Sequence, residues 1–401
     1  MKKEIIERIG ANELAYVTQV LEGQFASSSG ATFMSRLEKS FCDLYGSKFA
    51  VSMINGTATL HASLEAAGVG VGDEVIVPPL TMSATSFAVL QTGATPVFAD
   101  VDEETLQISP NSIKSRITSR TKAIITVALY GLSPDMDPIM AIAETHGLFI
   151  LEDNAECFMG FYKNRLAGLS GHAASFSFQS SKHLTSGEGG IVITDDEKFA
   201  ENLRRVSSLG YAGVGASKGK ITKRDIQNPE YSRHLTMGWN YRMPELCCAV
   251  ALAQVERIKT LVQRRQDVAE LFGQVTCNYD WLRPQRVPDD CVHSYWTYVA
   301  ILDANGPSWI QFRDAFVENG GDGIYAAWKL TYLEPMFENM TLLRRENGIP
   351  EKRQMEYSRG LCPTAEKLQP LILQFKTNYW DWEDAQKQAE ILHKTMDQLQ
   401  S

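Results

Sequence analysis

The sequence predicts an α/β protein: a large domain with a mainly parallel sheet, followed by a smaller α+β domain. From about residue 50, apolar segments rich in β-branched residues alternate with amphipathic helical segments, the order of a chain that builds a parallel sheet. A long helical stretch then leaves this part of the chain, and the boundary falls near residue 250. At 401 residues the chain is also too long for one simple core. We therefore place the large domain at residues 1–250 and the smaller one at residues 251–401.

The first half of the predicted sheet and its helices lie between residues 57 and 153, where strands and helices follow one another in strict order. Each strand is a short apolar run, and each helix carries apolar residues at helical spacing. The predicted strands are EVIVPPL, ATPVFADV, KAIITVALY and LFILED, and the predicted helices are TATLHASLEAAG, SATSFAVLQTG, PNSIKSRI and MDPIMAIAETHG.

The pattern becomes less regular after Asp153. Two strands, SFSF and GGIVITD, flank a polar turn that contains Lys182. Residues 212–233 are rich in Gly, Lys and Ser and predict a long mobile loop. Residues 243–275 predict one long helical stretch that leaves the large domain, with the boundary near Val250. The remainder predicts a strand (HSYWTYVAIL), a helix and a C-terminal helix.

Composition excludes several classes of protein. A net charge of −9 argues against nucleic-acid binding, which needs a basic face. No uninterrupted apolar run is long enough to cross a bilayer, and the N-terminus lacks the apolar segment of a signal peptide. The seven cysteines are scattered and odd in number, which indicates reduced thiols and a cytoplasmic location. Neither the cysteines nor the histidines have metal-ligand spacing, so we expect no metal site.

Asp153 and an Asn-Gly-Thr-Ala segment are the first candidate ligand-binding features. Ligands of open α/β sheets bind beyond the carboxyl ends of the strands, and Asp153 ends the strand LFILED. No GxGxxG follows the first strand, which argues against a dinucleotide site. Residues 55–58 begin a helix, where backbone N–H groups bind anions, although the same residues also suit a simple helix cap. Ser177 could add a hydroxyl to the same anion.

Lys182 has two interpretations, a surface lysine in a hairpin or an amine held at a strand edge to form a Schiff base. A P-loop is excluded because the glycines follow the lysine and a strand follows the glycines. An amine, a strand-end carboxylate and an anion site together suit pyridoxal 5′-phosphate (PLP). Its aldehyde needs an amine, its ring nitrogen needs a carboxylate to stay protonated, and its phosphate needs hydrogen-bond donors.

Seven segments carry a resemblance to a known family. The chain resembles the DegT/DnrJ/StrS family of PLP-dependent sugar aminotransferases, which have the aspartate aminotransferase-like (type I) PLP fold. Between Asn55 and Ile258 the matching segments occur in the family's order, whereas the final third matches only through CPTAEKL. The segments are NGTATL, GVGVGDEVIVPPLTMSAT, GATPVFADVDEETL, ITSRTKAIITVALYG with DMDPI, ILEDNAE, FSFQSSKHLTSGEGG and GWNYRMPELCCAVALAQVERI.

The resemblance implies a role for each matching position. Lys182 corresponds to the Schiff-base lysine, and Asp153 to the aspartate paired with the pyridine nitrogen. Glu156 falls where a residue faces the ring oxygen. In family dimers the GWNYRM segment reaches the neighbouring subunit's site, so Asn240 or Arg242 is expected to contact cofactor or substrate there. The phosphate cradle corresponds to Gly56, Thr57, Ala58 and Ser177.

Three features depart from the family pattern, and the last two bear on the substrate pocket. Met82 stands where members place an aromatic ring against the cofactor, and a thioether can still pack on a π-system. Ala128 replaces a common histidine, and LILQFKTNY replaces the usual strand after the C-terminal AE. His183 suits a structural role better than that of a base, because side chains of adjacent residues diverge.

Two further groups of residues have alternative interpretations. One could neutralise a nucleotide diphosphate or form a solvated loop, and the other could stack on a base or sugar or pack in the core. The first is Lys218, Lys220, Lys223 and Arg224, and the second is Trp328, Tyr332, Tyr379, Trp380 and Trp382.

The expected function is the transfer of an amino group from glutamate to a keto sugar, as in amino-sugar biosynthesis. The sugar is expected to be linked to a nucleotide. Glutamate and the sugar are implied by the resemblance, as is a homodimer with shared sites. Two rivals remain. One is a regulatory protein that keeps the PLP fold without turnover, and the other is a PLP-dependent sugar dehydratase or isomerase. Lys182 and Asp153 argue against the first, and lysine rather than histidine at position 182 argues against the second.

Overall fold

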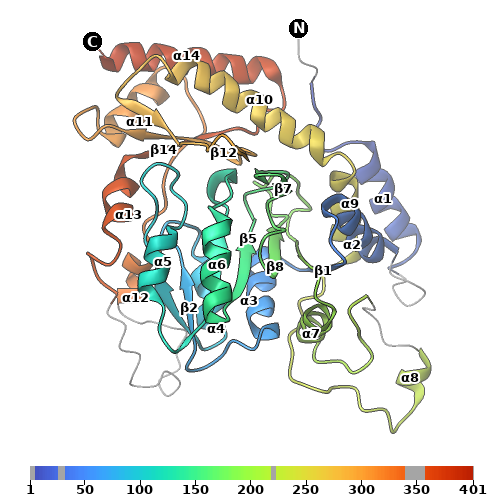
Figure 1. Ribbon diagram of the computed structural model, residues 1–401. Coiled ribbons are helices and arrows are strands. Elements are labelled where there is room, and N and C mark those ends of the chain that lie inside the picture. Colours follow the sequence, from blue (N-terminus) through green and yellow to red (C-terminus); the bar gives the residue numbers. More distant parts are fainter. Residues whose placement is uncertain (1–4, 26–31, 218–222, 339–356, 401) are drawn as a thin grey trace.

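The computed structural model describes residues 5–25, 32–217, 223–338 and 357–400 (Figure 1). Its largest sheet has seven strands, in the order β1 (Phe49–Met53), β9 (Gly190–Thr194), β8 (Ala173–Ser177), β5 (Phe149–Asp153), β4 (Thr121–Val127), β2 (Glu74–Val77) and β3 (Thr95–Phe98). Neighbouring strands from β8 to β3 are parallel, whereas β9 runs antiparallel to β1 and β8. The predicted α/β class with a mainly parallel sheet is therefore confirmed.

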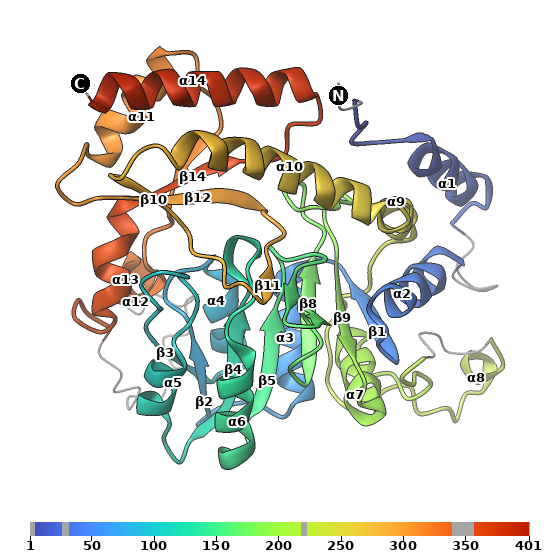
Figure 2. The ribbon, with the colours of Figure 1, turned by 45° about the horizontal axis from the view of Figure 1, so that its top comes forward.

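Helices cover both faces of this sheet, which explains why its strands are apolar throughout. The helices of one face are α3 (Gly56–Ala66), α4 (Ala84–Gln91) and α7 (Glu197–Ser207), and those of the other are α5 (Pro110–Arg116) and α6 (Met136–His146) (Figures 1 and 2). Side chains of a strand alternate between the faces. In β2, Val75 and Val77 join the core under α3 and α4, whereas Ile76 joins the core under α5 and α6.

A bundle of three helices closes the β1 side: α1 (Ala11–Glu22), α2 (Thr32–Tyr45) and α9 (Glu245–Val255). The expected single long helix is in fact two, because α9 ends before Arg257 and α10 (Ile258–Thr276) begins after it. The Arg257 guanidinium donates to the Glu7 carbonyl (2.7 Å) and to Glu13 (2.8 Å), which ties the break to the N-terminal segment. Residue 250 lies inside α9, and the division there stays a prediction.

A second, antiparallel sheet follows α10, with strands in the order β10 (Leu282–Pro284), β12 (Thr297–Leu302), β14 (Ile372–Lys376) and β13 (Ile324–Ala326). It packs against α10, α11 (Trp309–Glu318) and α14 (Trp382–Gln400), which lie together at the top of Figure 2. The segment that departs from the family pattern near residue 372 therefore still forms a strand, β14. The carboxyl ends of β5 and β8 point toward α10 (Figure 2).

The remaining described elements are short. A three-stranded sheet joins the two halves of the chain, because β11 (Cys291–Val292) pairs with β6 (Phe161–Tyr162), which pairs with β7 (Arg165–Leu166). The short helices are η2 (Leu129–Gly131), α8 (Lys223–Gln227), η3 (Thr331–Leu333), α12 (Pro335–Glu338), α13 (Pro363–Leu368) and η4 (Gln369–Leu371). Of the predicted cationic cluster, Lys218 and Lys220 lie outside the described residues.

Candidate active site

The predicted anion site forms where β1 turns into α3. Asn55 has an extended backbone, and its side chain accepts a hydrogen bond from the Ala58 amide (2.8 Å), so Asn55 caps the helix. The amides of Gly56 and Thr57 have no hydrogen-bond acceptor among the described residues. Two of the three predicted amides are therefore available to an anion, whereas that of Ala58 is already bonded to Asn55.

Ser177, at the end of β8, adjoins this helix start. A Cβ atom on Gly56 would lie 2.8 Å from the Ser177 Cβ, a distance that side chains do not tolerate, so only glycine permits the approach. Ser177 is 93% buried and lies against Gly56. N–H groups at a helix N-terminus together with a nearby hydroxyl match the requirements of a phosphate. Gly56, Thr57 and Ser177 thus fit a phosphate cradle.

Asp153 ends β5, at the edge of the sheet where Ser177 also lies, and its carboxylate is buried. It accepts hydrogen bonds from the Thr85 hydroxyl (2.9 Å) and the Ala155 amide (3.2 Å). Burial raises the pKa of Asp153 to about 6, although these two hydrogen bonds and the charge of Lys182 oppose the rise. No cation forms an ion pair with Asp153 within the described ranges. A buried carboxylate without such a pair suits a protonated ring nitrogen.

Lys182 lies in the turn between β8 and β9, with its amine turned toward Glu156. Its Nζ is 3.2 Å from Glu156 Oε1 and 4.4 Å from the centre of the Trp296 ring. The other Glu156 oxygen accepts a hydrogen bond from the Tyr130 amide (3.0 Å). Glu156 follows Asp153 by three residues, so the structure brings Lys182, Glu156 and Asp153 to one place.

The other predicted cofactor contacts, Met82, Asn240 and Arg242, are exposed to solvent in the single chain. Met82 lies three residues before Thr85, the partner of Asp153, and is 50% exposed. Its packing against the cofactor stays a prediction. The segment with Asn240 and Arg242 runs beside the end of β1, because Arg242 pairs with Met53. Both side chains are exposed at the surface of the single chain, which leaves their expected role in a neighbouring site untested.

His183 and two of the predicted stacking residues are structural in this chain. The His183 ring is buried, and its Nε2 donates to the Ser294 carbonyl (2.9 Å). Burial lowers the pKa of His183 well below its usual value, so the imidazole is neutral. Its hydrogen bond to Ser294 supports a structural role and not that of a base. Tyr332 and Tyr379 are buried in the cores and donate to Glu366 and Asp322.

Sequence reasoning missed Thr85, Tyr130 and Trp296. Thr85 lies in the family-like TMSAT segment, whose hydroxyl could have been considered as a partner for the strand-end aspartate. Tyr130 has φ 65°, a conformation that the sequence LYG does not reveal. Trp296 is 114 residues from Lys182, so no local pattern predicts that the two meet.

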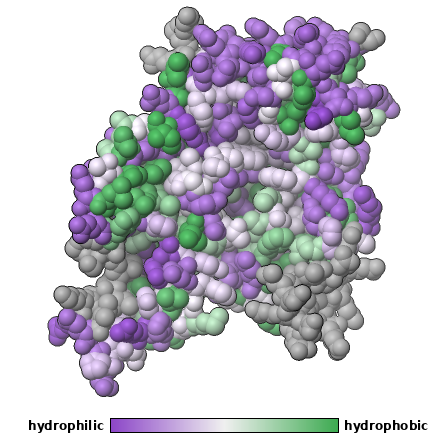
Figure 3. Space-filling view, turned by 180° about the vertical axis from the view of Figure 1, so that it is seen from behind, coloured by the Kyte–Doolittle hydropathy of each residue, from purple (hydrophilic) through white to green (hydrophobic). Residues whose placement is uncertain are grey.

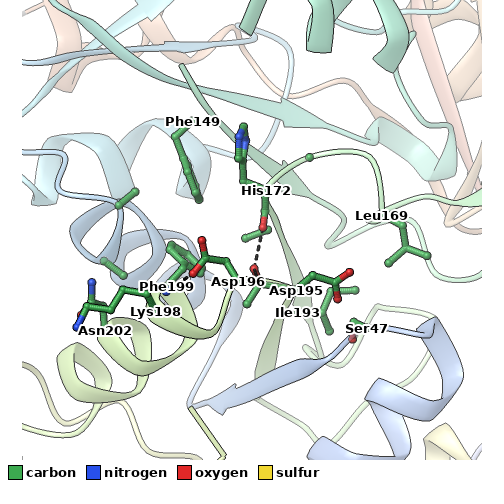
Figure 4. A pocket seen from close by; sticks show the side chains of 16 residues that line it. Ser47, Phe149, Leu169, His172, Ile193, Asp195, Asp196, Lys198, Phe199 and Asn202 are labelled. Carbon is green, nitrogen blue, oxygen red and sulfur yellow. Dashed lines mark hydrogen bonds between the residues drawn. The ribbon is translucent and has the colours of Figure 1, made fainter. Parts of the chain in front are cut away.

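The cavity in Figure 4 lies elsewhere, at the opposite end of the sheet from Asp153 and Lys182. Its volume is about 640 Å³, and it is lined by residues that include Phe149 at the start of β5, His172 before β8, and Phe199 in α7 (Figure 4). None of the predicted site residues lines it. Within the described ranges, no three His, Cys, Asp or Glu side chains come together as metal ligands, and no helix has the length and apolarity to span a bilayer.

Comparisons with known proteins find similar sequences over most of the chain. A model of the DegT/DnrJ/EryC1/StrS aminotransferase family matches residues 7–352. The chain is 38% identical over 295 residues to "Spore coat polysaccharide biosynthesis protein SpsC" of Bacillus subtilis, covering 74% of each chain. It is 36% identical over 291 residues to GDP-perosamine synthase of Escherichia coli O157:H7, covering 72% of this chain and 74% of the relative.

Solved structures show the same fold over nearly the whole length. An aminotransferase from Psychrobacter cryohalolentis superposes with a TM-score of 0.85 at 28% identity, covering 100% of both chains. DesV of S. venezuelae superposes with a TM-score of 0.80 at 26% identity, covering 96% of this chain and 94% of DesV. The type I fold is therefore confirmed.

Proposed function

Because the chain belongs to the DegT/DnrJ/EryC1/StrS aminotransferase family, we propose that it is a PLP-dependent enzyme that transfers an amino group from glutamate to a nucleotide-linked keto sugar. The observation that carries this proposal is the convergence of Lys182, Asp153 and the start of α3 at one edge of the sheet. One relative is named for a GDP-linked sugar, which supports a nucleotide carrier.

Each residue has a separate task in this proposal. Pyridoxal phosphate, when bound, supplies an electron sink for the carbon that loses its proton. The amides of Gly56 and Thr57 hold its phosphate, and Asp153 keeps its ring nitrogen protonated. The Lys182 amine, once free, would take the proton from the donor's α-carbon and deliver it to C4′ of the cofactor. Glu156 holds that amine in place between transfers.

A reaction with glutamate in the absence of any sugar distinguishes an aminotransferase from the two rival functions. In an aminotransferase, the first half of the reaction needs no sugar, so glutamate should release one equivalent of 2-oxoglutarate per site and leave pyridoxamine phosphate on the protein. Bound cofactor and oxoacid can be measured in a single turnover. A regulatory protein would leave both cofactor and glutamate unchanged. A dehydratase that never consumes glutamate, yet still converts a sugar nucleotide, would contradict the proposal.

A homodimer is the proposed active unit, and exposed apolar residues support it. Figure 3 shows an apolar patch on the side where α1 lies, and Leu14 and Leu21 of α1 are 71% and 52% exposed. Leu235 and Met237, in the segment that leads to Arg242, are 58% and 80% exposed. An exposed apolar patch such as that in Figure 3 marks a protein contact.

We expect inactive Lys182→Ala and inactive Arg242→Ala proteins to complement each other when their subunits exchange. If Arg242 serves the neighbouring site, a mixed dimer has one doubly defective site and one intact site. Random exchange of equal amounts should therefore restore about a quarter of the wild-type activity. Native mass spectrometry verifies the exchange. A mixture that exchanges fully but stays inactive would place Arg242 in its own subunit's site.

A further inference from the structure

Arg265 reaches the backbone of Lys182 from the second half of the chain. It lies in α10, is 99% buried, and uses both ends of its guanidinium. One end, Nη2, donates to the carbonyls of Ser181 (2.8 Å) and Lys182 (3.1 Å). The other, Nη1, donates to the carbonyl of Trp296 (2.8 Å) and the hydroxyl of Thr377 (3.2 Å). Arg265 therefore joins the lysine turn to the residue that precedes β12 and to the residue that follows β14.

The charge of Arg265 is unusual for its position. No carboxylate pairs with it among the residues that the structure describes, and burial lowers its pKa well below the usual value. A buried cation is costly unless hydrogen bonds compensate, and here four neutral oxygens do so. A neutral or smaller side chain would avoid this cost if the site only needed filling. The retention of a charged guanidinium here therefore indicates that its several N–H donors are needed to hold these oxygens in place.

A second arginine holds the other side of the same turn. Arg8, from the N-terminal segment, donates to the carbonyls of Lys182 (2.8 Å), His183 (2.9 Å) and Ser180 (3.3 Å). Four consecutive carbonyls, from residue 180 to residue 183, are therefore bonded to arginines. Trp296 also donates from its ring to the Ser181 carbonyl (3.1 Å), beneath the Lys182 amine.

We propose that Arg265 is a positioning residue that holds the turn so that the Lys182 amine can reach the cofactor's aldehyde. This inference rests on the proposed function, because it requires Lys182 to form the covalent bond. The turn from 178 to 189 has no helix or strand of its own to fix its backbone. The lysine side chain is long, so a shift of the backbone is carried directly to its amine. Reaction rates fall about 100-fold for misplacements near 1 Å.

The dissociation constants of the two forms of the cofactor distinguish a positioning role of Arg265 from a role in packing alone. Pyridoxal phosphate bonds covalently to the lysine, whereas pyridoxamine phosphate has no aldehyde and binds only through phosphate and ring. If Arg265 positions Lys182, Arg265→Met should raise the dissociation constant of pyridoxal phosphate about 10-fold and that of pyridoxamine phosphate less than about 2-fold. The kcat should fall about 100-fold, and Arg265→Lys, which keeps the charge but not the fork, should recover part of it.

Arg264 provides a matched control on the same helix. It is equally buried, but it donates to the Trp380 carbonyl (2.9 Å) and lies over the Trp382 ring. Arg264→Met should lower the melting temperature as Arg265→Met does, yet leave the ratio of the two dissociation constants unchanged. If both variants change the ratio equally, or neither changes it, Arg265 is only a packing residue. Should Arg265→Met not fold, Arg265→Gln carries the same comparison.

Borohydride reduction of the wild-type protein separates failure of this inference from failure of the proposed function. If the reduced cofactor is attached to a residue other than Lys182, the proposed site is wrong and the inference falls with it. If the adduct is on Lys182 while Arg265→Met keeps the wild-type ratio of dissociation constants, only the positioning role is overturned.

Discussion

Lys182→Ala should abolish the covalent attachment of pyridoxal phosphate and reduce amino transfer by about 10⁴-fold or more. The amine lies 3.2 Å from Glu156 in a site that also holds Asp153, and alanine can neither bond to an aldehyde nor move a proton. Borohydride treatment followed by peptide mapping measures the attachment, and single-turnover release of 2-oxoglutarate measures the chemistry. The wild-type protein should yield one modified peptide, which contains residue 182.

Lys163→Ala is the matched control for this prediction. Lys163 is half-exposed and pairs with Asp137 at the surface, so its loss should leave both attachment and turnover unchanged. Phosphate binding should survive in Lys182→Ala, because the amides at the start of α3 are untouched. A reduced adduct on another lysine, or substantial turnover in Lys182→Ala, would show that position 182 is not the amine that reacts.

Asp153→Asn should lower kcat by about 10³-fold while weakening cofactor binding by less than about 10-fold. Asparagine keeps the shape and can still accept a hydrogen bond from the Thr85 hydroxyl, which is 2.9 Å from Asp153. It cannot hold the ring nitrogen in its protonated state, so the electron sink is lost. The phosphate contacts, which carry much of the affinity, remain. Near-normal kcat in Asp153→Asn would remove the proposed pairing.

The same substitution has a second signature in the cofactor-free protein. Burial raises the pKa of Asp153 to about 6, so the folded state holds a proton that the unfolded chain releases near pH 4. The stabilising contribution is complete below pH 4 and is lost as the pH rises through 6, by about 3 kcal/mol in the free energy of unfolding. Urea titrations at several pH values measure the free energy of unfolding, which should fall between about pH 4 and pH 6 by this amount more in the wild type than in Asp153→Asn. Parallel curves would contradict the burial argument.

The candidate site positions could be proposed from the sequence because each depends on a short local pattern. A β-branched run that ends in aspartate places Asp153 at a strand's carboxyl end, whatever the neighbouring strands do. Asn-Gly-Thr before an apolar helix places free amides at a helix start in the same way. These patterns were incomplete in detail, since Asn55 occupies the Ala58 amide that the sequence assigned to the phosphate.

The sequence by itself therefore determined the fold class and the candidate residues for the chemistry, because both follow from periodicity and from motifs within a few residues. Only the tertiary structure decided what surrounds them. Arg265 and Trp296 meet Lys182 because α10 and β12 pack over the carboxyl ends of the parallel strands, and Thr85 meets Asp153 because the start of α4 lies near the carboxyl end of β5. Contacts between residues about 70 to 180 positions apart depend on how whole elements dock, and no local pattern encodes that packing.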